Sequence, residues 1–236
     1  MAAMEAATLG LRRVKLLEGL TEEALERVAR VCTWRRFEPG RAVITRSSSS
    51  RDLYMVVAGQ VRITIYTASG RQVHFRDLAQ GETVGAIAAV DGGPRSVDVM
   101  ALTEVVVAIL TPIELNALLH ENPFVADRFT RHLVQLIRRL TETVIELSTL
   151  GVVNRIHADL LRAARDAGAQ PTGSCVLSPA PRHADIAARV STTREQVTRE
   201  MSSLAKRGLL VKHPEGLLIS DMNVLERMVE RASHDA

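Results

Sequence analysis

The chain has 236 residues, a formal net charge of +3, two cysteines and seven histidines. Its length favours two domains, and neither a signal-peptide pattern nor roughly 18 uninterrupted apolar residues mark it as secreted or membrane-spanning. Cys32 and Cys175 are too few for a disulfide framework or iron–sulfur site, and the histidines lack metal-ligand spacing.

We therefore expect a cytoplasmic protein without a membrane partner, metal, haem or iron–sulfur cluster. The sequence also lacks a GxSxG motif, a Walker loop and a recognisable acid–base pair, so we expect no enzyme activity.

The first half of the chain changes its pattern after residue 32. Residues 11–32 predict one amphipathic helix, with Thr21-Glu22-Glu23 as its cap and first turn. From residue 33 to residue 110, short runs rich in Val, Ile and Tyr alternate with turn signals, which predicts an antiparallel sandwich or barrel. The turn signals are Glu38-Pro39-Gly40, Ala58-Gly59-Gln60, Ser69-Gly70-Arg71, Gln80-Gly81-Glu82 and Asp91-Gly92-Gly93-Pro94. The polar run 47–50 shows no sign of function.

A candidate anion-binding loop lies within residues 85–101. Ala86–Ala89 is long enough for one helical turn, Asp91-Gly92-Gly93 ends it, and Pro94 fixes the approach to Arg95-Ser96. Free backbone N–H groups at such a turn favour an anion, and the planar guanidinium matches phosphate. The Ser96 hydroxyl adds one more donor. A solvated arginine is the alternative reading of this stretch taken alone.

A long helix is predicted from Asn122-Pro123 to about residue 150. Its apolar residues follow alternating steps of four and three, which is typical of a coiled-coil seam. The seam consists of Phe129, Leu133, Leu136, Leu140, Thr143, Leu147 and Leu150. A core stripe packed on the β domain is the alternative. Ile137 and Val144 widen the stripe, so that one helix can serve both surfaces, and Thr141 lies just off the seam.

Gly151 follows this helix and is the predicted hinge, because glycine frees the backbone and disfavours helix by about 1 kcal/mol. Residues 154–166 then predict another helix. A bend at Gly151 would move everything that follows relative to the long helix.

Residues 182–208 predict two helices joined by a short turn. Apolar residues recur at helical spacing on both sides of Ser191-Thr192-Thr193, and these hydroxyls favour a helix start near Thr193. The second helix of such a helix-turn-helix fits the DNA major groove. Arginine reads guanine and glutamate accepts from cytosine. The DNA-binding candidates are Thr193, Arg194, Glu195, Thr198 and Arg199.

Two apolar runs around Pro214-Glu215-Gly216 predict a β-hairpin, which forms a wing after a helix-turn-helix. Residues 182–212 carry seven basic and three acidic side chains. This local excess suits contacts with DNA phosphates, and Lys212 on the hairpin is a candidate for one of them.

The order of these motifs resembles the catabolite activator (cyclic-AMP receptor) and fumarate–nitrate regulator family of bacterial transcription factors. The likeness covers about residues 15–230 and includes the run Asp52–Gly59, Pro94-Arg95-Ser96, the long helix and Thr193-Arg194-Glu195 with Arg199. It implies an α+β fold: a cyclic-nucleotide-binding-type antiparallel β-roll (1–121), a dimerisation helix (122–150) and a winged helix-turn-helix domain (151–236). It also implies a homodimer that binds a palindromic operator on double-stranded DNA, with RNA polymerase as a further partner.

By position, the resemblance makes Arg194, Glu195 and Arg199 readers of a TGTGA-like half-site. It places Gly85, Arg95 and Ser96 at the phosphate of a cyclic nucleotide. In cyclic-AMP binders a glutamate follows that glycine and accepts from the ribose 2′-hydroxyl, but Ala86 stands here. Leu140 and Thr141 occupy the positions that read adenine, so one polar contact is replaced by an apolar one.

Three functions follow. The first is a DNA-binding regulator gated by cyclic AMP or cyclic GMP. The second is a regulator that binds DNA constitutively or with another ligand, as Ala86 suggests. The third, a ligand-binding module that acts on a partner protein, has no use for the arginines of a helix-turn-helix. Activation and repression are both open, although the resemblance favours an activator.

Overall fold

The computed structural model describes residues 2–66, 72–170 and 173–234. The chain divides into two compact units, residues 1–137 and 138–236. The predicted α+β class is confirmed, because the first unit is built on antiparallel sheets and the second contains a helix-turn-helix. Within the described residues, no helix is long and apolar enough to cross a membrane.

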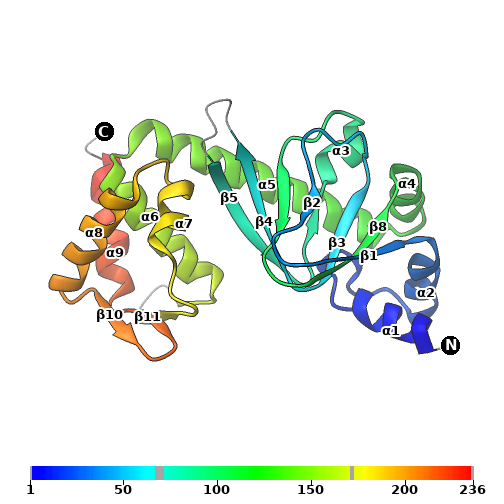
Figure 1. Cartoon of the computed structure of the whole chain (residues 1–236), viewed down its shortest axis with the longest axis horizontal. Helices are drawn as coiled ribbons and strands as arrows, with labels where there is room; N and C mark the ends of the chain where they lie inside the picture. Colours follow the sequence, from blue (N-terminus) through cyan, green and yellow to red (C-terminus); the bar gives the residue numbers. More distant parts are fainter. Residues whose placement is uncertain (1, 67–71, 171–172, 235–236) are drawn as a thin grey trace. The chain divides into compact units, whose positions relative to one another are not determined.

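Two four-stranded antiparallel sheets form the first unit, in the orders β1-β8-β3-β6 and β2-β7-β4-β5 (Figure 1). The strands are β1 (Thr33–Phe37), β2 (Ala42–Ile44), β3 (Leu53–Ala58), β4 (Gln60–Tyr66), β5 (Gln72–Ala79), β6 (Thr83–Val84), β7 (Asp98–Ala101) and β8 (Val105–Leu110). Four of the expected turns separate these strands; the fifth, Ser69-Gly70-Arg71, lies outside the described residues.

Strand β3 lies between two hydrophobic clusters, one on each of its faces. Leu53, Met55 and Val57 pack with the helices of this unit. Tyr54 and Val56 point the other way and join a cluster to which both sheets contribute. Side chains alternate between the two faces of a strand. Both faces of β3 are therefore buried, which explains its nearly continuous apolar sequence.

The helices of the first unit differ from the prediction at residues 11–32. They are α1 (Ala2–Leu11), the 3-10 turn η1 (Lys15–Leu17), α2 (Glu22–Val31), α3 (Ala86–Asp91) and α4 (Pro112–Glu121). The single helix predicted over 11–32 is wrong, because the Lys15 amide donates to Gly81 O and Gly19 has φ +78°. The Thr21 cap is confirmed: its hydroxyl accepts from the Ala24 amide.

Helix α5 (Pro123–Thr149) matches the predicted long helix. Its apolar residues are buried near its start and exposed in its later turns. Near its start, Phe129 is buried in the core of the first unit and Leu133 packs against that core. Further on, Ile137, Val144 and Leu147 are exposed. The core-stripe alternative therefore holds for the first turns, whereas the later turns leave an apolar face uncovered.

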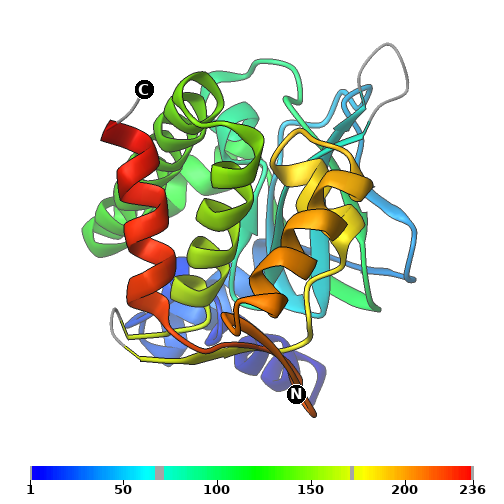
Figure 2. The same ribbon diagram turned by 90° about the vertical axis from the view of Figure 1, so that its left-hand side faces the viewer.

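The second unit packs helices on a small sheet (Figure 2). Its further elements are α6 (Val152–Asp166), β9 (Cys175–Leu177), α7 (His183–Arg189), α8 (Arg194–Lys206), β10 (Leu210–His213), β11 (Gly216–Ile219) and α9 (Met222–His234). Strand β11 pairs with both β10 and β9, and the sequence had not predicted β9. The red helix α9 runs beside the yellow-green α6 and covers the core formed by the buried faces of α6 and α8.

Candidate functional site

Helix α8 begins where the cap was predicted. The Thr193 hydroxyl accepts a hydrogen bond from the Gln196 amide at 3.3 Å, which satisfies one of the free N–H groups of the first turn. Val197, Met201 and Leu204 are buried and fix the helix to its core. The cap and the buried face together determine which side chains of α8 remain outside.

Four predicted DNA-binding residues lie on the exposed face of α8. Arg194, Glu195, Thr198 and Arg199 line one shallow hollow of the surface. The backbone N–H of Glu195 and the Thr193 hydroxyl hold the pKa of the Glu195 carboxyl below its usual range, and the two arginines act in the same direction. Glu195 is therefore ionised at neutral pH and acts only as an acceptor.

The turn before α8 and the helix α7 are fixed by polar contacts. Ser191 in the turn has φ +54°, a conformation that few residues other than glycine adopt. The Thr198 hydroxyl lies 2.9 Å from Arg194 O, to which it donates, and 2.9 Å from His183 Nδ1. Thr198 therefore connects α8 to the start of α7 and is already engaged within the protein.

Helix α6 supports both helices of the motif. His157 Nε2 lies 2.7 Å from Glu200 Oε1 on α8, and His157 is buried. On another face of α6, Asp159 pairs with Arg189 of α7. Helix α6 is therefore joined by a polar contact to each helix of the helix-turn-helix, to α8 through His157 and to α7 through Asp159.

The predicted wing is the hairpin of β10 and β11, in which His213 pairs with Gly216. A Cβ at Gly216 would lie 2.0 Å from Leu177 O, so only glycine allows β9 to approach this closely. Lys212 is exposed on β10. The hairpin is thus held from one side and presents its lysine to solvent.

The candidate anion-binding loop surrounds α3 in the first unit. Gly85 precedes α3 with φ +92°, and a Cβ there would lie 2.6 Å from Arg95 Nη1 and 2.7 Å from Asp52 O. Ala86 is buried, and its methyl group offers no hydrogen bond to a ligand. Ser96 is exposed beside the buried Arg95. Gly85 is therefore required so that the arginine can pass beneath the loop.

Arg95 is only 5% exposed and is held by protein acceptors. Nη2 donates to Asp52 O at 2.8 Å and to Ser50 Oγ at 3.0 Å, and Nη1 donates to Gly85 O at 3.3 Å. The guanidinium also lies over the Tyr54 ring, 5.5 Å from its centroid. Burial lowers the pKa of Arg95, while Tyr54 and Asp52 oppose that shift.

One atom of Arg95 is left over. Within the described residues, its buried Nε has no hydrogen-bond partner. A buried donor without an acceptor costs about 1–3 kcal/mol. A ligand that offered an acceptor to Arg95 Nε would remove this cost.

The remaining predicted residues lie in the second unit. Leu140 and Thr141 are exposed on α5. Gly151 caps α6 with φ −62° and ψ 159°, a conformation open to any residue. Its role as a hinge remains a prediction.

Two family models match the chain. The cyclic nucleotide-binding domain matches residues 34–122, and the Crp-like helix-turn-helix domain matches residues 154–228, so that together they span more than half of it. The chain belongs to the CRP/FNR family. It is therefore a DNA-binding transcription regulator with a cyclic-nucleotide-binding type of domain, in a family of regulators rather than enzymes.

CRP/FNR relatives align over nearly the whole chain. The CRP-like cAMP-activated global transcriptional regulator of Mycobacterium tuberculosis (strain CDC 1551 / Oshkosh) is 24% identical over 222 residues, which cover 94% of this chain and 98% of that protein. The Cyclic AMP receptor protein of Thermus thermophilus is 27% identical over 216 residues, covering 90% and 95%.

Solved CRP/FNR-like structures share the fold. A CooA mutant from Carboxydothermus hydrogenoformans gives a TM-score of 0.74 at 16% identity and covers 90% of this chain and 92% of that one. FixK2 from Bradyrhizobium japonicum gives 0.67 at 19% identity, covering 84% and 96%. At these identities the likeness shows the fold alone.

Sequence reasoning missed the residues that hold Arg95. The run 47–50 had shown no function, yet Ser50 accepts from Arg95 and donates to Asp52 Oδ2 at 2.7 Å. Asp52 and Tyr54 belong to the run Asp52–Gly59, whose pattern by itself does not indicate a contact with Arg95. The available signal is their position at the start of β3, an otherwise apolar and buried strand, where a polar group requires a partner.

Proposed function

We propose that this chain forms a homodimer that reads a palindromic, TGTGA-like operator through two copies of α8. The observation that carries the proposal is that Arg194, Glu195 and Arg199 are exposed on the first turns of α8. That helix is capped by Thr193, and its opposite face is buried. Arginine matches the acceptor pair of guanine and ionised glutamate accepts from cytosine. Lys212 on the wing is suited to a phosphate contact.

Helix α5 is the proposed dimer contact. Its later turns expose Ile137, Leu140, Val144 and Leu147, whereas Val125 and Phe129 near its start are buried. Pairing with the same face of a second copy would cover these side chains and give two-fold symmetry, which suits a palindrome. RNA polymerase as a partner and location in the cytoplasm follow from this role.

A cyclic nucleotide, cyclic AMP or cyclic GMP, is the proposed effector. Arg95 and Ser96 suit its phosphate, and the buried Nε of Arg95 has no acceptor among the described residues. The family resemblance assigns the base to Thr141, which is exposed on α5. Two relatives carry names that describe cyclic AMP as their activator or ligand. Binding would bias how two α5 helices meet. A bend at Gly151 would then bring the recognition helices about 34 Å apart.

A regulator with another ligand, or with none, is the second candidate. Ala86 is buried and cannot accept from a ribose hydroxyl, and Arg95 already has three protein acceptors. One solved relative, CLP of Xanthomonas campestris, is described as c-di-GMP responsive. A lost partner for a ligand hydroxyl costs about 1–3 kcal/mol, so this candidate predicts weak or absent binding of cyclic AMP.

Calorimetric titration of the purified protein with cyclic AMP and cyclic GMP tests the effector. We expect a dissociation constant on the order of micromolar for one of the two. Ser96→Ala removes an exposed hydroxyl and is expected to weaken binding by about threefold to tenfold. Arg95→Lys removes the planar fork and is expected to weaken binding by at least about tenfold.

Ser148→Ala, an exposed serine on α5, is the matched control and is expected to bind as the wild type does. Absence of binding by the wild type would reject cyclic nucleotide gating and leave the second candidate. Equal binding by Ser96→Ala and Arg95→Lys would show that the nucleotide binds elsewhere.

A further inference from the structure

One face of α6 carries three charged residues at helical spacing, Arg155, Asp159 and Arg162. Arg155 Nη1 donates to Leu150 O at 2.8 Å, and its Nε donates to Val190 O at 2.9 Å. Leu150 directly follows α5, and Val190 begins the turn of the helix-turn-helix. A single guanidinium therefore holds the end of α5 and that turn together.

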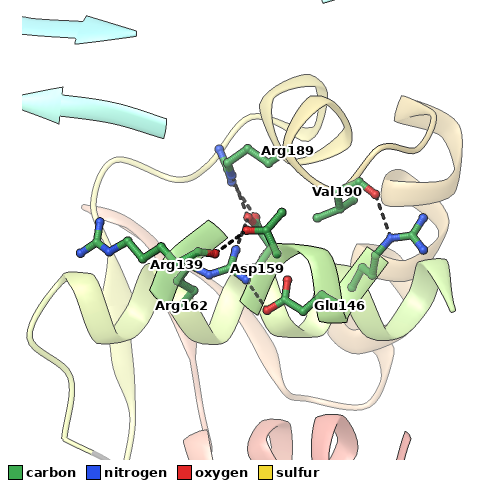
Figure 3. Close-up of polar contacts among 8 residues, drawn as sticks. Arg139, Glu146, Asp159, Arg162, Arg189 and Val190 are labelled. Carbon is green, nitrogen blue, oxygen red and sulfur yellow. Dashed lines mark hydrogen bonds and ion pairs between the residues drawn. The ribbon is translucent and has the colours of Figure 1, made fainter. Parts of the chain in front are cut away.

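Asp159 extends the connection into α7. It is 3% exposed, and its two oxygens accept from Arg189 Nε at 2.8 Å and Arg189 Nη2 at 2.7 Å (Figure 3). A buried carboxylate requires such a partner, and the two parallel bonds fix the orientation of α7.

Arg162 joins Asp159 to α5. Its Nη1 lies 3.7 Å from Asp159 Oδ1, and its Nη2 pairs with Glu146 on the last turns of α5 (Figure 3). Burial alone would lower the pKa of Arg162, but Glu146 and Asp159 outweigh it and raise the pKa. The result is a continuous ionic chain, Glu146–Arg162–Asp159–Arg189, that runs across three helices.

The ionic chain matters most at its α5 end, because α6, α7 and α8 share one hydrophobic core. Among the described residues, the hydrophobic core of the second unit takes no member from α5. The later turns of α5 nevertheless belong to this unit and carry its exposed apolar face, which includes Leu140 and Val144. The polar contacts of Glu146 and Arg155 therefore join the end of α5 to the packed group of helices that includes α8.

We propose that the chain Glu146–Arg162–Asp159–Arg189, with the Arg155 bridge, sets the number of base pairs between the two half-sites that the protein accepts. The inference rests on the proposed dimer, in which the α5 faces meet. While these contacts are made, α5 and α6 cannot bend further at Gly151, so the separation of the two α8 helices is fixed. One extra base pair moves a half-site by about 3.4 Å and turns it by roughly 35°.

The test first selects from random DNA the paired half-sites that the full-length wild type binds. Its affinity is then measured for operators that keep these half-sites and change the spacer between them in single base-pair steps. We expect the wild type to lose roughly tenfold in affinity one base pair from its optimum, and Glu146→Gln to lose about threefold or less. The readout is the ratio between spacers, because the removed negative charge strengthens binding to all DNA. Base preference within each half-site should not change.

Glu226→Gln is the matched control. Glu226 also pairs with an arginine of α6, Arg165, and the two glutamates are similarly exposed, at 24% for Glu146 and 30% for Glu226. Its partner helix is α9, however, so this variant should keep the sharp spacer optimum. Arg155→Lys retains its charge but cannot span both carbonyl groups, and it should broaden the optimum as Glu146→Gln does.

The outcomes separate the two proposals. If the wild type selects no paired half-sites, the proposed dimeric function is wrong. If the wild type has a sharp optimum that Glu146→Gln and Arg155→Lys both retain, this inference alone is overturned. Equal broadening by Glu226→Gln would also overturn it, because loss of charge rather than loss of the chain would then be the cause.

Discussion

At the scale of single residues, arginine serves three different purposes in this chain. Arg95 is buried beneath a loop, Arg189 neutralises a buried carboxylate, and Arg194 and Arg199 are exposed on the recognition helix. The sequence shows the same residue type at all four positions. Burial separates them, because a guanidinium away from water must be satisfied by protein acceptors, whereas an exposed one is available to DNA.

We predict that Arg199→Ala and Glu195→Gln each relax preference at one position of the operator half-site. Each is expected to reduce discrimination by about 1–3 kcal/mol, because a base edge loses its matching partner. Competition between operators that differ at single base pairs measures this loss.

Lys212→Ala is the control for these readers, and it should weaken binding to all sequences alike and reduce the salt dependence. If Arg199→Ala and Glu195→Gln lost as much affinity for random DNA as for the operator, a base-reading role for Arg199 and Glu195 would be contradicted. Because the folded-state pKa of Glu195 is lowered, its carboxylate should stay ionised as the pH falls to the usual glutamate value. The Glu195-dependent preference should therefore disappear only at lower pH.

At the scale of elements, local signals predicted α2, α3 and α5 to α8, whereas α1, α4 and α9 were not predicted. The caps at Thr21 and Thr193 depend on residues three positions away, and both were predicted correctly. The helix expected over 11–32 is interrupted because Lys15 bonds to Gly81, far along the chain. The third strand of the wing sheet, β9, was missed because three residues are too few for a clear alternating pattern.

We predict that Gly151→Ala changes the free energy of unfolding of the second unit by less than about 1 kcal/mol. Alanine lowers the entropy of the unfolded chain, but it is disfavoured relative to glycine at the N-cap of α6. The backbone there is in a region open to alanine, and an added Cβ meets no described atom within 4 Å. Denaturant unfolding measures the change. If the glycine acts as a hinge, the ratio of operator affinities with and without effector should also fall. An unchanged ratio would show that glycine is not needed for gating.

At the scale of the whole molecule, the two units divide the work of α5. Its first turns complete the core of the first unit, and its later turns leave apolar side chains exposed in the second. A single stripe of apolar residues in the sequence therefore serves two surfaces. Exposed apolar patches of this kind commonly mark sites of association.

We predict that Val144→Asp converts the protein from dimer to monomer. Val144 is 62% exposed in the single chain, so the aspartate should leave the fold intact but place a charge on the proposed dimer face of α5. Sedimentation velocity measures the oligomeric state. Ile113→Asp, at an 82% exposed position in the first turn of α4, is the control and should remain dimeric. A dimeric Val144→Asp would reject α5 as the contact.

The sequence by itself predicted the β-rich first half, the long helix, the helix-turn-helix with the cap of α8, and the hairpin after it. These depend on contacts between residues a few positions apart, which a linear pattern records. Only the tertiary structure decided that Ser50 and Asp52 hold Arg95, that α5 contributes Val125 and Phe129 to a core but exposes its later apolar residues, and that Asp159 pairs with Arg189. The physical reason is burial: which charges lose water, and which partner each one then requires, depends on residues brought together from distant parts of the chain.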